Sequence, residues 1–297
     1  MPLRVTRILA PNPDVFTLEG TNTWIVGEEP AIVIDPGPDM PEHLEEVRRA
    51  AGRVAAVLLT HDHPDHAPGA AGFAASVDAP LFAFRFPGAE HLRDGQSFAG
   101  GGAEVTAIHT PGHTSDHVAF FVASGGALFT GDAVLGRGTS FIDPPDGDLA
   151  QYLRSLRRMR DLAPRTIYPG HGPVVLDADA KLGEYLRHRE ERERQVLDAL
   201  ADGPATITEL VETIYAAYPD DVRPLAARSV LAHLLKLEAE GRVERTGKGE
   251  DARYEVSAPR SCARCGNPVK GRATLCGPCS LAVLQEGSSA TPEKGAG

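Results

Sequence analysis

The most informative stretch of this chain is THDHPDH, residues 60–66. It places three histidines and two aspartates within seven residues, and these are side chains that bind divalent metals. In an extended loop His61 and His63 point to the same side, and Asp65 and His66 follow one step further on. The segment therefore predicts ligands for two metal ions side by side. The alternative is a polar loop whose charged side chains only face solvent.

Further histidines and aspartates follow short apolar runs, each at a sharp glycine turn. The apolar run Val105–Ile108 precedes the segment PGHTSDH (111–117). In the same way, Ala127–Thr130 precedes Gly131-Asp132, and Thr166–Tyr168 precedes PGHG (169–172). Short β-branched or aromatic runs bounded by Gly and Pro are typical of buried strands. Polar residues placed directly after such strands would converge at one edge of a sheet.

The order HxHxDH, PGH, GD and PGHG resembles the metallo-β-lactamase superfamily. The resemblance implies an α/β fold, an αβ/βα sandwich in which helices cover two facing sheets and the metals lie at the sheets' edge. It also implies a ligand set. One metal would be held by His61, His63 and His113, the second by Asp65, His66 and His171, and Asp132 would bridge the two.

The chemistry of such a centre follows from its charges. Imidazole and carboxylate ligands suit two Zn²⁺ ions, and Mn²⁺ or Fe²⁺ would accept the same ligands. Asp65, Asp132 and a bridging hydroxide would leave about one unit of positive charge for an anionic substrate. Because zinc lowers the pKa of bound water toward about 7, the hydroxide would exist at neutral pH. The sequence predicts a metal-dependent hydrolase in which Asp65 and Asp132 are catalytic ligands.

Other candidates surround the metals. Asp35 follows the apolar run Ile32–Ile34 and resembles the family residue that orients a ligand, although an Asp before Pro-Gly also suits a plain turn. His117, four residues after His113, is expected to protonate a leaving group or contact substrate, with an ordinary surface histidine as the alternative. Residues predicted to contact substrate from rim loops are Asn22, Thr139 and Ser140.

The C-terminal part predicts a winged helix. Helices are expected over 180–202, 207–215 and 226–240, followed by a hairpin that pairs 242–245 with 253–256. The core motifs together with ELVETIY (209–215) and HLLKLEAEG (233–241) resemble the β-lactamase-like protein 2 group over about residues 5–256. Members of that group are endoribonucleases that act on single-stranded RNA. The resemblance therefore implies phosphodiester hydrolysis, with the winged helix leaning over the metal edge.

All four cysteines fall in two CxxC pairs, Cys262 with Cys265 and Cys276 with Cys279. Four thiolates at this spacing predict one structural Zn²⁺ in a zinc-ribbon-like module, with no open position for water. A redox dithiol or a pair of disulfides is the alternative. The expected domains are a catalytic core (1–176), a connecting helix (177–202), the winged helix (203–257), the four-cysteine module (260–282) and a disordered tail (283–297).

Composition limits the location and the partners. The chain has 297 residues, 42% of them hydrophobic, and a net charge of −11. That charge argues against a globally basic nucleic-acid-binding protein. Without a signal peptide or an apolar run near 18 residues, a cytoplasmic protein without a membrane partner is expected. A homodimer remains open.

Three functions compete. The first is cleavage of single-stranded RNA by the bridging hydroxide, although residues 203–257 hold seven Lys/Arg against ten Asp/Glu. The second is a glyoxalase II-like hydrolase of a small thioester or lactone, because such enzymes share the metal motifs. The third is a DNA-binding regulator with a vestigial metal core, in which Arg228, His233 and Lys236 would line a recognition helix. The complete ligand set favours the two enzymes.

Overall fold

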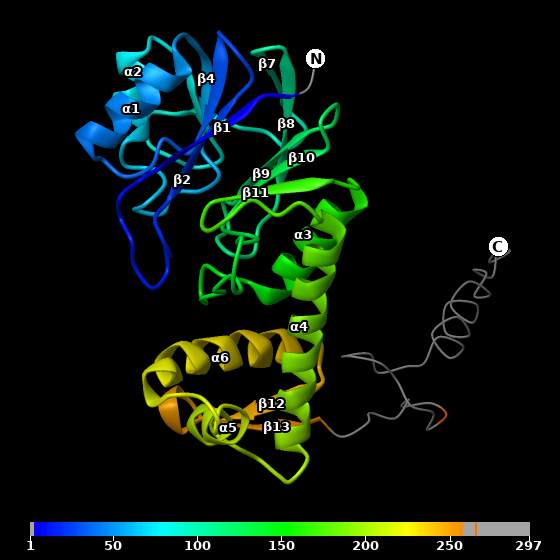
Figure 1. The fold of residues 1–297 in the computed structure, drawn as a ribbon. Coiled ribbons are helices and arrows are strands. Elements are labelled where there is room, and N and C mark those ends of the chain that lie inside the picture. The colour runs from blue at the N-terminus through cyan, green and yellow to red at the C-terminus, as the bar shows by residue number, and fades with distance from the viewer. Residues whose placement is uncertain (1–2, 258–264, 266–297) are drawn as a thin grey trace, which may run out of the picture. The chain divides into compact units, whose positions relative to one another are not determined.

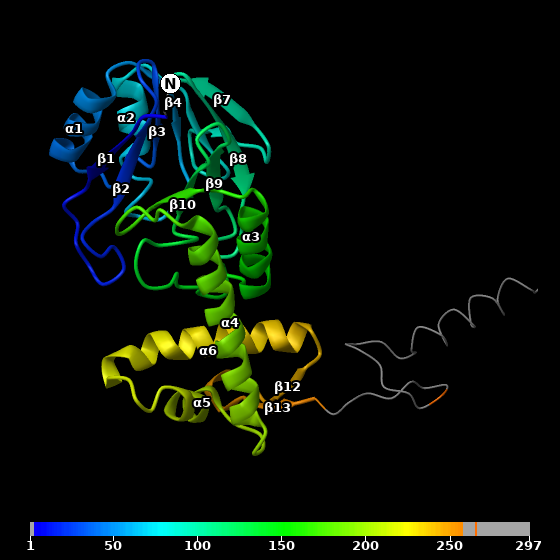
Figure 2. The ribbon, with the colours of Figure 1, turned by 45° about the vertical axis from the view of Figure 1, so that its right-hand side comes forward.

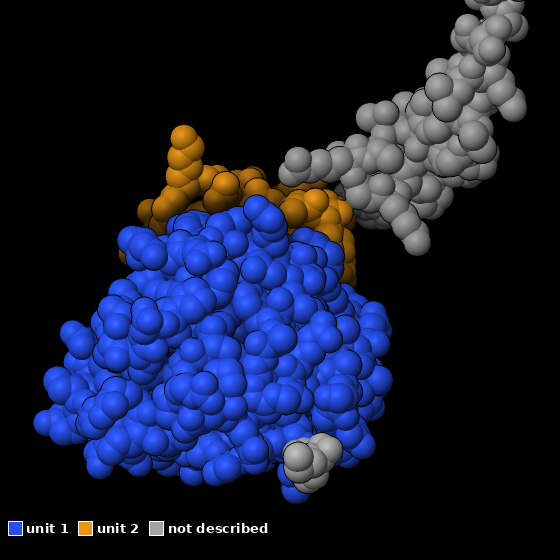
Figure 3. Space-filling view, turned by 90° about the horizontal axis from the view of Figure 1, so that it is seen from above, with its two compact units in different colours: residues 1–191 blue, residues 192–297 orange. Residues whose placement is uncertain are grey.

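The computed structural model describes residues 3–257 and 265. The chain divides into two compact units, the first ending at Glu191 and the second beginning at Arg192 (Figure 3). Three of the four cysteines and the predicted tail lie outside the described residues, so the structural zinc site stays a prediction; Cys265 is exposed. Across the described part of the chain, no helix is both long and apolar enough to cross a bilayer.

The first sheet of unit 1 has six strands in chain order. They are β1 (Val5–Leu9), β2 (Asn22–Val26), β3 (Ala31–Ile34), β4 (Val54–Leu58), β5 (Leu81–Ala83) and β6 (Glu90–His91). The first three strands are antiparallel, and from β3 onward neighbours are parallel. Parallel neighbours need a crossover, which α1 (Pro41–Ala51) and α2 (Ala70–Ser76) provide (Figure 1). Pro41 in the first turn and Gly52 after the last fit the start and end of α1.

The second sheet has five strands in the order β11-β10-β9-β8-β7. Their bounds are β7 (Ser97–Gly100), β8 (Ala103–His109), β9 (Val118–Val122), β10 (Ala127–Gly131) and β11 (Thr166–Pro169). Only β10 and β11 are parallel, and the crossover between them contains α3 (Leu149–Asp161), whose N-cap Asp148 accepts a hydrogen bond from the Gln151 N–H. The strands predicted before the three glycine turns are therefore present as β8, β10 and β11.

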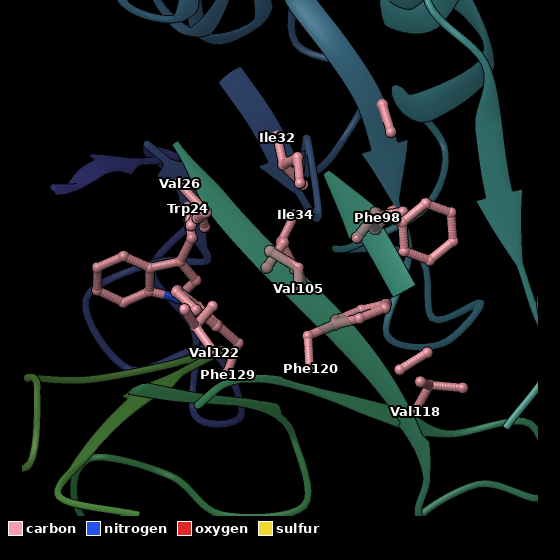
Figure 4. Packing of buried hydrophobic residues seen from close by; sticks show 14 of the residues in the cluster. Trp24, Val26, Ile32, Ile34, Phe98, Val105, Val118, Phe120, Val122 and Phe129 are labelled. Atoms are coloured by element: carbon pink, nitrogen blue, oxygen red, sulfur yellow. The ribbon is translucent and has the colours of Figure 1, made fainter. Parts of the chain in front are cut away.

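The two sheets face each other across the main core (Figure 4). Ile32 and Ile34 on β3 pack in one cluster with Phe120 and Phe129 of the second sheet, while Val33 between them turns to the cluster that contains α1 and α2. Side chains alternate in this way along any strand. Helix α3 lies beside the second sheet (Figures 1 and 2), and α4 (Ala178–Leu200), which follows β11, contains the boundary between the two units. The predicted αβ/βα sandwich is confirmed.

Strand direction explains why the predicted ligands converge. Strand β9 is antiparallel to both β8 and β10, and β11 is parallel to β10, so β8, β10 and β11 run in one direction. The segments that carry His113, Asp132 and His171 leave the carboxyl ends of these three strands. On the first sheet, Asp35 follows β3 and the THDHPDH segment follows β4, again at carboxyl ends.

The second unit is the predicted winged helix. The end of α4 is followed by α5 (Ile207–Ile214), the 3₁₀ turn η1 (Asp220–Val222), α6 (Arg223–Ala239), β12 (Val243–Thr246), the turn η2 (Gly249–Asp251) and β13 (Arg253–Val256). A core of its own includes Val196, Leu210, Val230 and Tyr254. Helix α6 begins three residues earlier than predicted, because Pro224 suits the first turn of a helix.

The recognition helix required by the DNA-binding hypothesis is not supported. His233 is buried, and the Lys236 side chain is only 11% exposed. Lys236 Nζ lies 2.6 Å from Glu193 Oε2 and 2.8 Å from Glu240 Oε1, so its charge is compensated within the unit. Two of the three residues named for a recognition helix, His233 and Lys236, are therefore not exposed basic side chains on α6.

Glu193→Ala should destabilise the second unit, because Lys236 and Arg242 lose one of the two carboxylates that they share and keep only Glu240. We expect the free energy of unfolding to fall by about 1–3 kcal/mol. Chemical denaturation measures the free energy of unfolding, and hydrogen exchange of the amides of α4 and α6 shows where stability is lost. Glu212→Ala, on an exposed position of α5, is the matched control and should change stability by less than about 0.5 kcal/mol. Equal stability of the two variants would contradict the account.

Candidate metal centre

The predicted ligands meet in two clusters in the first unit. In the first cluster, ligand atoms of His61, His63, His113 and Asp132 all lie within 4.8 Å of one another. In the second, those of Asp65, His66 and His171 do the same. The structure thus brings together all seven residues that the motifs predicted, in the grouping that the family resemblance implied.

Asp132 lies between the clusters and turns one oxygen to each. Its Oδ2 is 3.8 Å from His113 Nε2 and 4.0 Å from His61 Nε2. Its Oδ1 is 3.3 Å from His66 Nε2 and 3.2 Å from His171 Nε2. A carboxylate placed in this way can bridge two ions.

The spacing of the ligand atoms fits metal ions. Tetrahedral zinc has ligands at about 2.0–2.2 Å, which places neighbouring ligand atoms roughly 3.4 Å apart. Asp65 Oδ2 is 3.2 Å from His66 Nε2 and 3.1 Å from His171 Nε2. In the first cluster, His113 Nε2 is 3.3 Å from His63 Nδ1. His61 Nε2 is buried without a hydrogen-bond partner among the described residues, and a cation in the cluster would satisfy it.

Most histidine ligands are oriented through their second ring nitrogen. The Nδ1 contacts are His61 with Thr60 Oγ1 (2.9 Å), His66 with Asp35 Oδ2 (2.9 Å), His113 with Phe141 O (2.7 Å) and His171 with Gly20 O (3.2 Å). A proton held at Nδ1 leaves the lone pair of Nε2 for the cluster. His63 differs, because its Nδ1 faces the cluster.

Asp35 connects the two clusters. Its buried side chain accepts hydrogen bonds from Thr60 N at 2.8 Å, Thr60 Oγ1 at 2.7 Å and His66 Nδ1 at 2.9 Å. Because the Thr60 hydroxyl donates to Asp35, it must accept from Nδ1 of His61. One carboxylate therefore orients a ligand of each cluster, which is the kind of role that the sequence suggested for Asp35.

The β1–β2 loop positions the second cluster in a way that the sequence did not predict. Thr21 Oγ1 donates to Asp65 Oδ2 at 3.0 Å. Asn22 is fully buried, and its amide donates to Pro169 O at 3.0 Å and Gly172 O at 2.9 Å, on both sides of His171. The expected rim position of Asn22 is therefore wrong. Its polar side chain satisfies carbonyl groups inside the fold instead.

The segment that contains the other two predicted rim residues also contains an aromatic residue, Phe141. Thr139 is exposed as expected, but Ser140 is buried and its Oγ donates to Asp132 O at 2.6 Å. Phe16, 51% exposed, lies with its ring centroid 6.1 Å from that of Phe141, whose carbonyl accepts from His113. The sequence analysis missed both aromatic residues, since nothing in their local pattern distinguishes an exposed ring from a core ring.

His117 is not placed to meet a substrate. Its side chain is fully buried, its Nδ1 lies 2.9 Å from Thr110 Oγ1, and its ring centroid is 5.2 Å from that of His61. Burial holds the pKa of His117 well below its usual value, so the ring is neutral at pH 7. The expectation that it protonates a leaving group is corrected: it packs behind a metal ligand.

Opposite charges dominate the second cluster. Burial alone would raise the pKa of the Asp132 carboxyl, but His66 and His171 hold it well below its usual range. Burial lowers the pKa of His171, yet the effect of Asp132 and Asp65 is larger and raises it to about 9. Without metal, protons therefore bind between the carboxylates and these imidazoles. A divalent ion would displace them and take over the same attraction.

Comparisons with known proteins agree with this centre. A family model described as the Metallo-beta-lactamase superfamily matches residues 16–171, and one described as the Beta-lactamase associated winged helix domain matches residues 206–252. A "Beta-lactamase-like protein 2 homolog" from Drosophila melanogaster is 36% identical over 86% of this chain and 95% of its own length. An "Atrochrysone carboxyl ACP thioesterase" from Aspergillus chevalieri is 35% identical over 81% of this chain and 82% of its own.

Solved structures show the same architecture. A metallo-beta-lactamase family protein from Thermus thermophilus superposes with a TM-score of 0.70 at 25% identity, over 85% of this chain and 98% of that one. A beta-lactamase domain protein from Burkholderia ambifaria gives a TM-score of 0.74 at 22% identity, over 86% of this chain and 91% of that one. The likeness thus extends beyond the catalytic core into the second unit.

Thr60→Val should weaken metal binding in the first cluster, because His61 loses the acceptor for its Nδ1 proton while the contact between His66 and Asp35 remains. We expect affinity there to fall about 10- to 100-fold, with the second cluster much less affected. Competition titrations with a chromophoric chelator measure both steps. Thr110→Val, an equally buried change beside His117, is the control and should leave both affinities near wild type. If Thr60→Val lowers the metal affinity of both clusters equally, this account is contradicted.

Proposed function

Because the chain belongs to the metallo-beta-lactamase superfamily, we propose that it is a two-metal hydrolase of single-stranded RNA that cleaves phosphodiester bonds. The hydrolase class follows from the superfamily and from the His/Asp clusters. The RNA substrate is the proposal. The observation that carries it is the division of the two Asp132 oxygens between the clusters, beside the half-buried Phe141 that contacts the exposed ring of Phe16.

The ligands match the needs of phosphodiester hydrolysis. Two divalent ions, Zn²⁺ or else Mn²⁺ or Fe²⁺, would supply a hydroxide nucleophile at neutral pH and positive charge for the phosphate oxygens. Asp65 and Asp132 contribute only two negative charges among the seven ligands, and the five histidines are neutral when they bind metal. The centre therefore stays cationic, which favours an anionic substrate.

The exposed residues of the site determine from which side a substrate can approach it. The Asp65 side chain is 23% exposed and that of Asp132 is 13% exposed, so a substrate can approach the carboxylate side of the clusters. Thr21 holds Asp65 in place from the β1–β2 loop through its hydroxyl. The histidines His61 and His66 are buried behind them and do not need to move.

The aromatic pair Phe16 and Phe141 supports an unpaired nucleic acid. Aromatic side chains stack on bases with little sequence preference, and only an unpaired strand presents the faces of its bases. Phe141 is also the residue whose carbonyl orients His113, which ties the position of this ring to a metal ligand.

Thioester or lactone hydrolysis is the second candidate, and exposed apolar side chains of the β1–β2 loop favour it. Val15 is 72% exposed and Phe16 51% exposed, and such side chains would suit an acyl chain or an aryl group. Two relatives from Aspergillus chevalieri and Aspergillus fumigatus are named "Atrochrysone carboxyl ACP thioesterase", at 35% and 36% identity. The hydroxide that the two ions would supply would then attack a carbonyl carbon instead of phosphorus.

The metal-loaded protein should cleave an end-labelled single-stranded RNA, and Asp132→Ala should reduce the rate at least about 100-fold because both ions lose their shared ligand. Gel analysis of initial rates measures this. Asp62→Ala, an exposed aspartate of the same motif that is outside both clusters, is the control and should stay within about threefold of wild type. Turnover of acyl thioesters with no RNA cleavage by a protein of verified metal content would replace the RNA proposal with the second candidate.

Phe16→Ala should raise KM for single-stranded RNA about tenfold, as expected from losing one stacked base, with little change in kcat. The substitution removes an exposed ring that lies outside both ligand clusters. Steady-state kinetics on an oligonucleotide series measures this. Leu176→Ala, which removes another exposed apolar side chain (81% exposed), is the control and should leave KM unchanged. If KM is unaltered in both variants, the aromatic pair does not contact the substrate.

A further inference from the structure

We propose that Arg189 on α4 is a positioning residue of the metal centre, whose guanidinium holds the segment Asp132–Phe141 through the carbonyl of Ser140. The inference rests on the proposed two-metal centre, but Arg189 and Ser140 themselves belong to neither cluster. Nothing in the ligand motifs points to Arg189, because it lies in a helix rich in Glu and Arg.

Within the described residues, the guanidinium of Arg189 is a buried charge without a counter-ion. Its side chain is 5% exposed, and among the residues that the structure describes no carboxylate lies within 4.0 Å of it. Its Nε is buried and finds no hydrogen-bond partner in the described part of the chain. The guanidinium carbon lies 5.4 Å from the ring centroid of Tyr152, but burial raises the pKa of Tyr152 to about 12, so the phenol is neutral. Such a charge is costly to bury and calls for a specific partner.

The partner that Arg189 has leads to the metal ligands. An N–H of its guanidinium donates to Ser140 O. The hydroxyl of the same Ser140 donates to Asp132 O at 2.6 Å, and the carbonyl of the next residue, Phe141, accepts from His113 Nδ1 at 2.7 Å. Arg189 thus fixes a peptide that touches the bridging ligand on one side and orients a ligand of the first cluster on the other.

The segment needs such support because it lacks ladder hydrogen bonds. Residues 132–148 are all described, and none of them belongs to a helix or strand. Side chains from two helices hold its first half: Tyr152 OH donates to Ala133 O at 2.6 Å, and Tyr185 OH accepts from Leu135 N at 2.9 Å. Arg189 provides the corresponding contact for the second half.

The placement of Arg189 on α4 suits this task. Tyr185 and Arg189 are four residues apart and share one face of the helix. Both contact the same loop, at Leu135 and at Ser140. Arginine also keeps its charge and presents a planar fork of donors, which neither lysine nor glutamine reproduces. A rigid helix face therefore sets the position of the loop.

The test compares Arg189→Met with Arg192→Met in the full chain. Arg192 lies on the same helix and is also buried (9% exposed), but it stacks over Tyr215 at 4.3 Å and donates to Gln195 Oε1 at 2.8 Å, within the second unit. Both variants should lose thermal stability. Only Arg189→Met should lower kcat, by about 10- to 100-fold at saturating metal, and Arg189→Lys should recover part of it.

Two further readouts do not depend on the substrate. The visible spectrum of the Co²⁺-loaded protein reports ligand geometry and should shift in Arg189→Met but not in Arg192→Met. Hydrogen exchange of the amides of residues 133–141, measured without added metal, should accelerate only in Arg189→Met. If the wild type cleaves no RNA, the proposed function fails, while these readouts still decide the role of Arg189.

A purely structural Arg189 would give a different pattern. The proposal is overturned if Arg189→Met keeps the wild-type cobalt spectrum and the wild-type hydrogen exchange of residues 133–141. It is also overturned if the two Met variants lose kcat equally. If Arg189→Met does not fold, Arg189→Lys is compared with Arg192→Lys on the same readouts. A change confined to the Arg189 variant supports the proposal, and indistinguishable variants overturn it.

Discussion

The metal centre depends on the buried carboxylate of Asp35. It lies just past β3, where it accepts hydrogen bonds from the backbone and hydroxyl of Thr60 and from His66. A carboxylate at this depth is tolerated only when its oxygens are satisfied, so the start of the THDHPDH segment must approach β3. His61 is then fixed through Thr60, and His66 directly. The orientation of one ligand in each cluster thus follows from the need to satisfy a single buried charge.

The remaining ligands are positioned by strand direction and by side chains from helices. Strands β8, β10 and β11 run the same way and bring His113, Asp132 and His171 to one edge. The segment after Asp132 lacks regular structure, and α3 and α4 hold it by polar contacts. A two-metal centre therefore combines ligands at strand ends, which are rigid, with a loop that owes its position to tyrosine and arginine side chains.

The sequence predicted the ligands and the strands that carry them, because each ligand type lies in a short motif at the end of a recognisable apolar run. It misplaced Asn22, since a polar residue in Gly-Thr-Asn-Thr resembles a loop residue until β2 buries it against two carbonyls. Phe16 and Arg189 went unnoticed for a related reason. Whether a ring is exposed, or an arginine buried, depends on tertiary packing that no local pattern contains.

The most direct test of this account is crystallography of the metal-loaded protein with anomalous scattering recorded at the absorption edge of the bound metal. We expect two peaks in the first unit, one among His61, His63 and His113 and one among Asp65, His66 and His171, with one oxygen of Asp132 bound to each. A single peak, or two peaks that do not share Asp132, would contradict the bridged two-metal centre and the hydrolytic chemistry that rests on it.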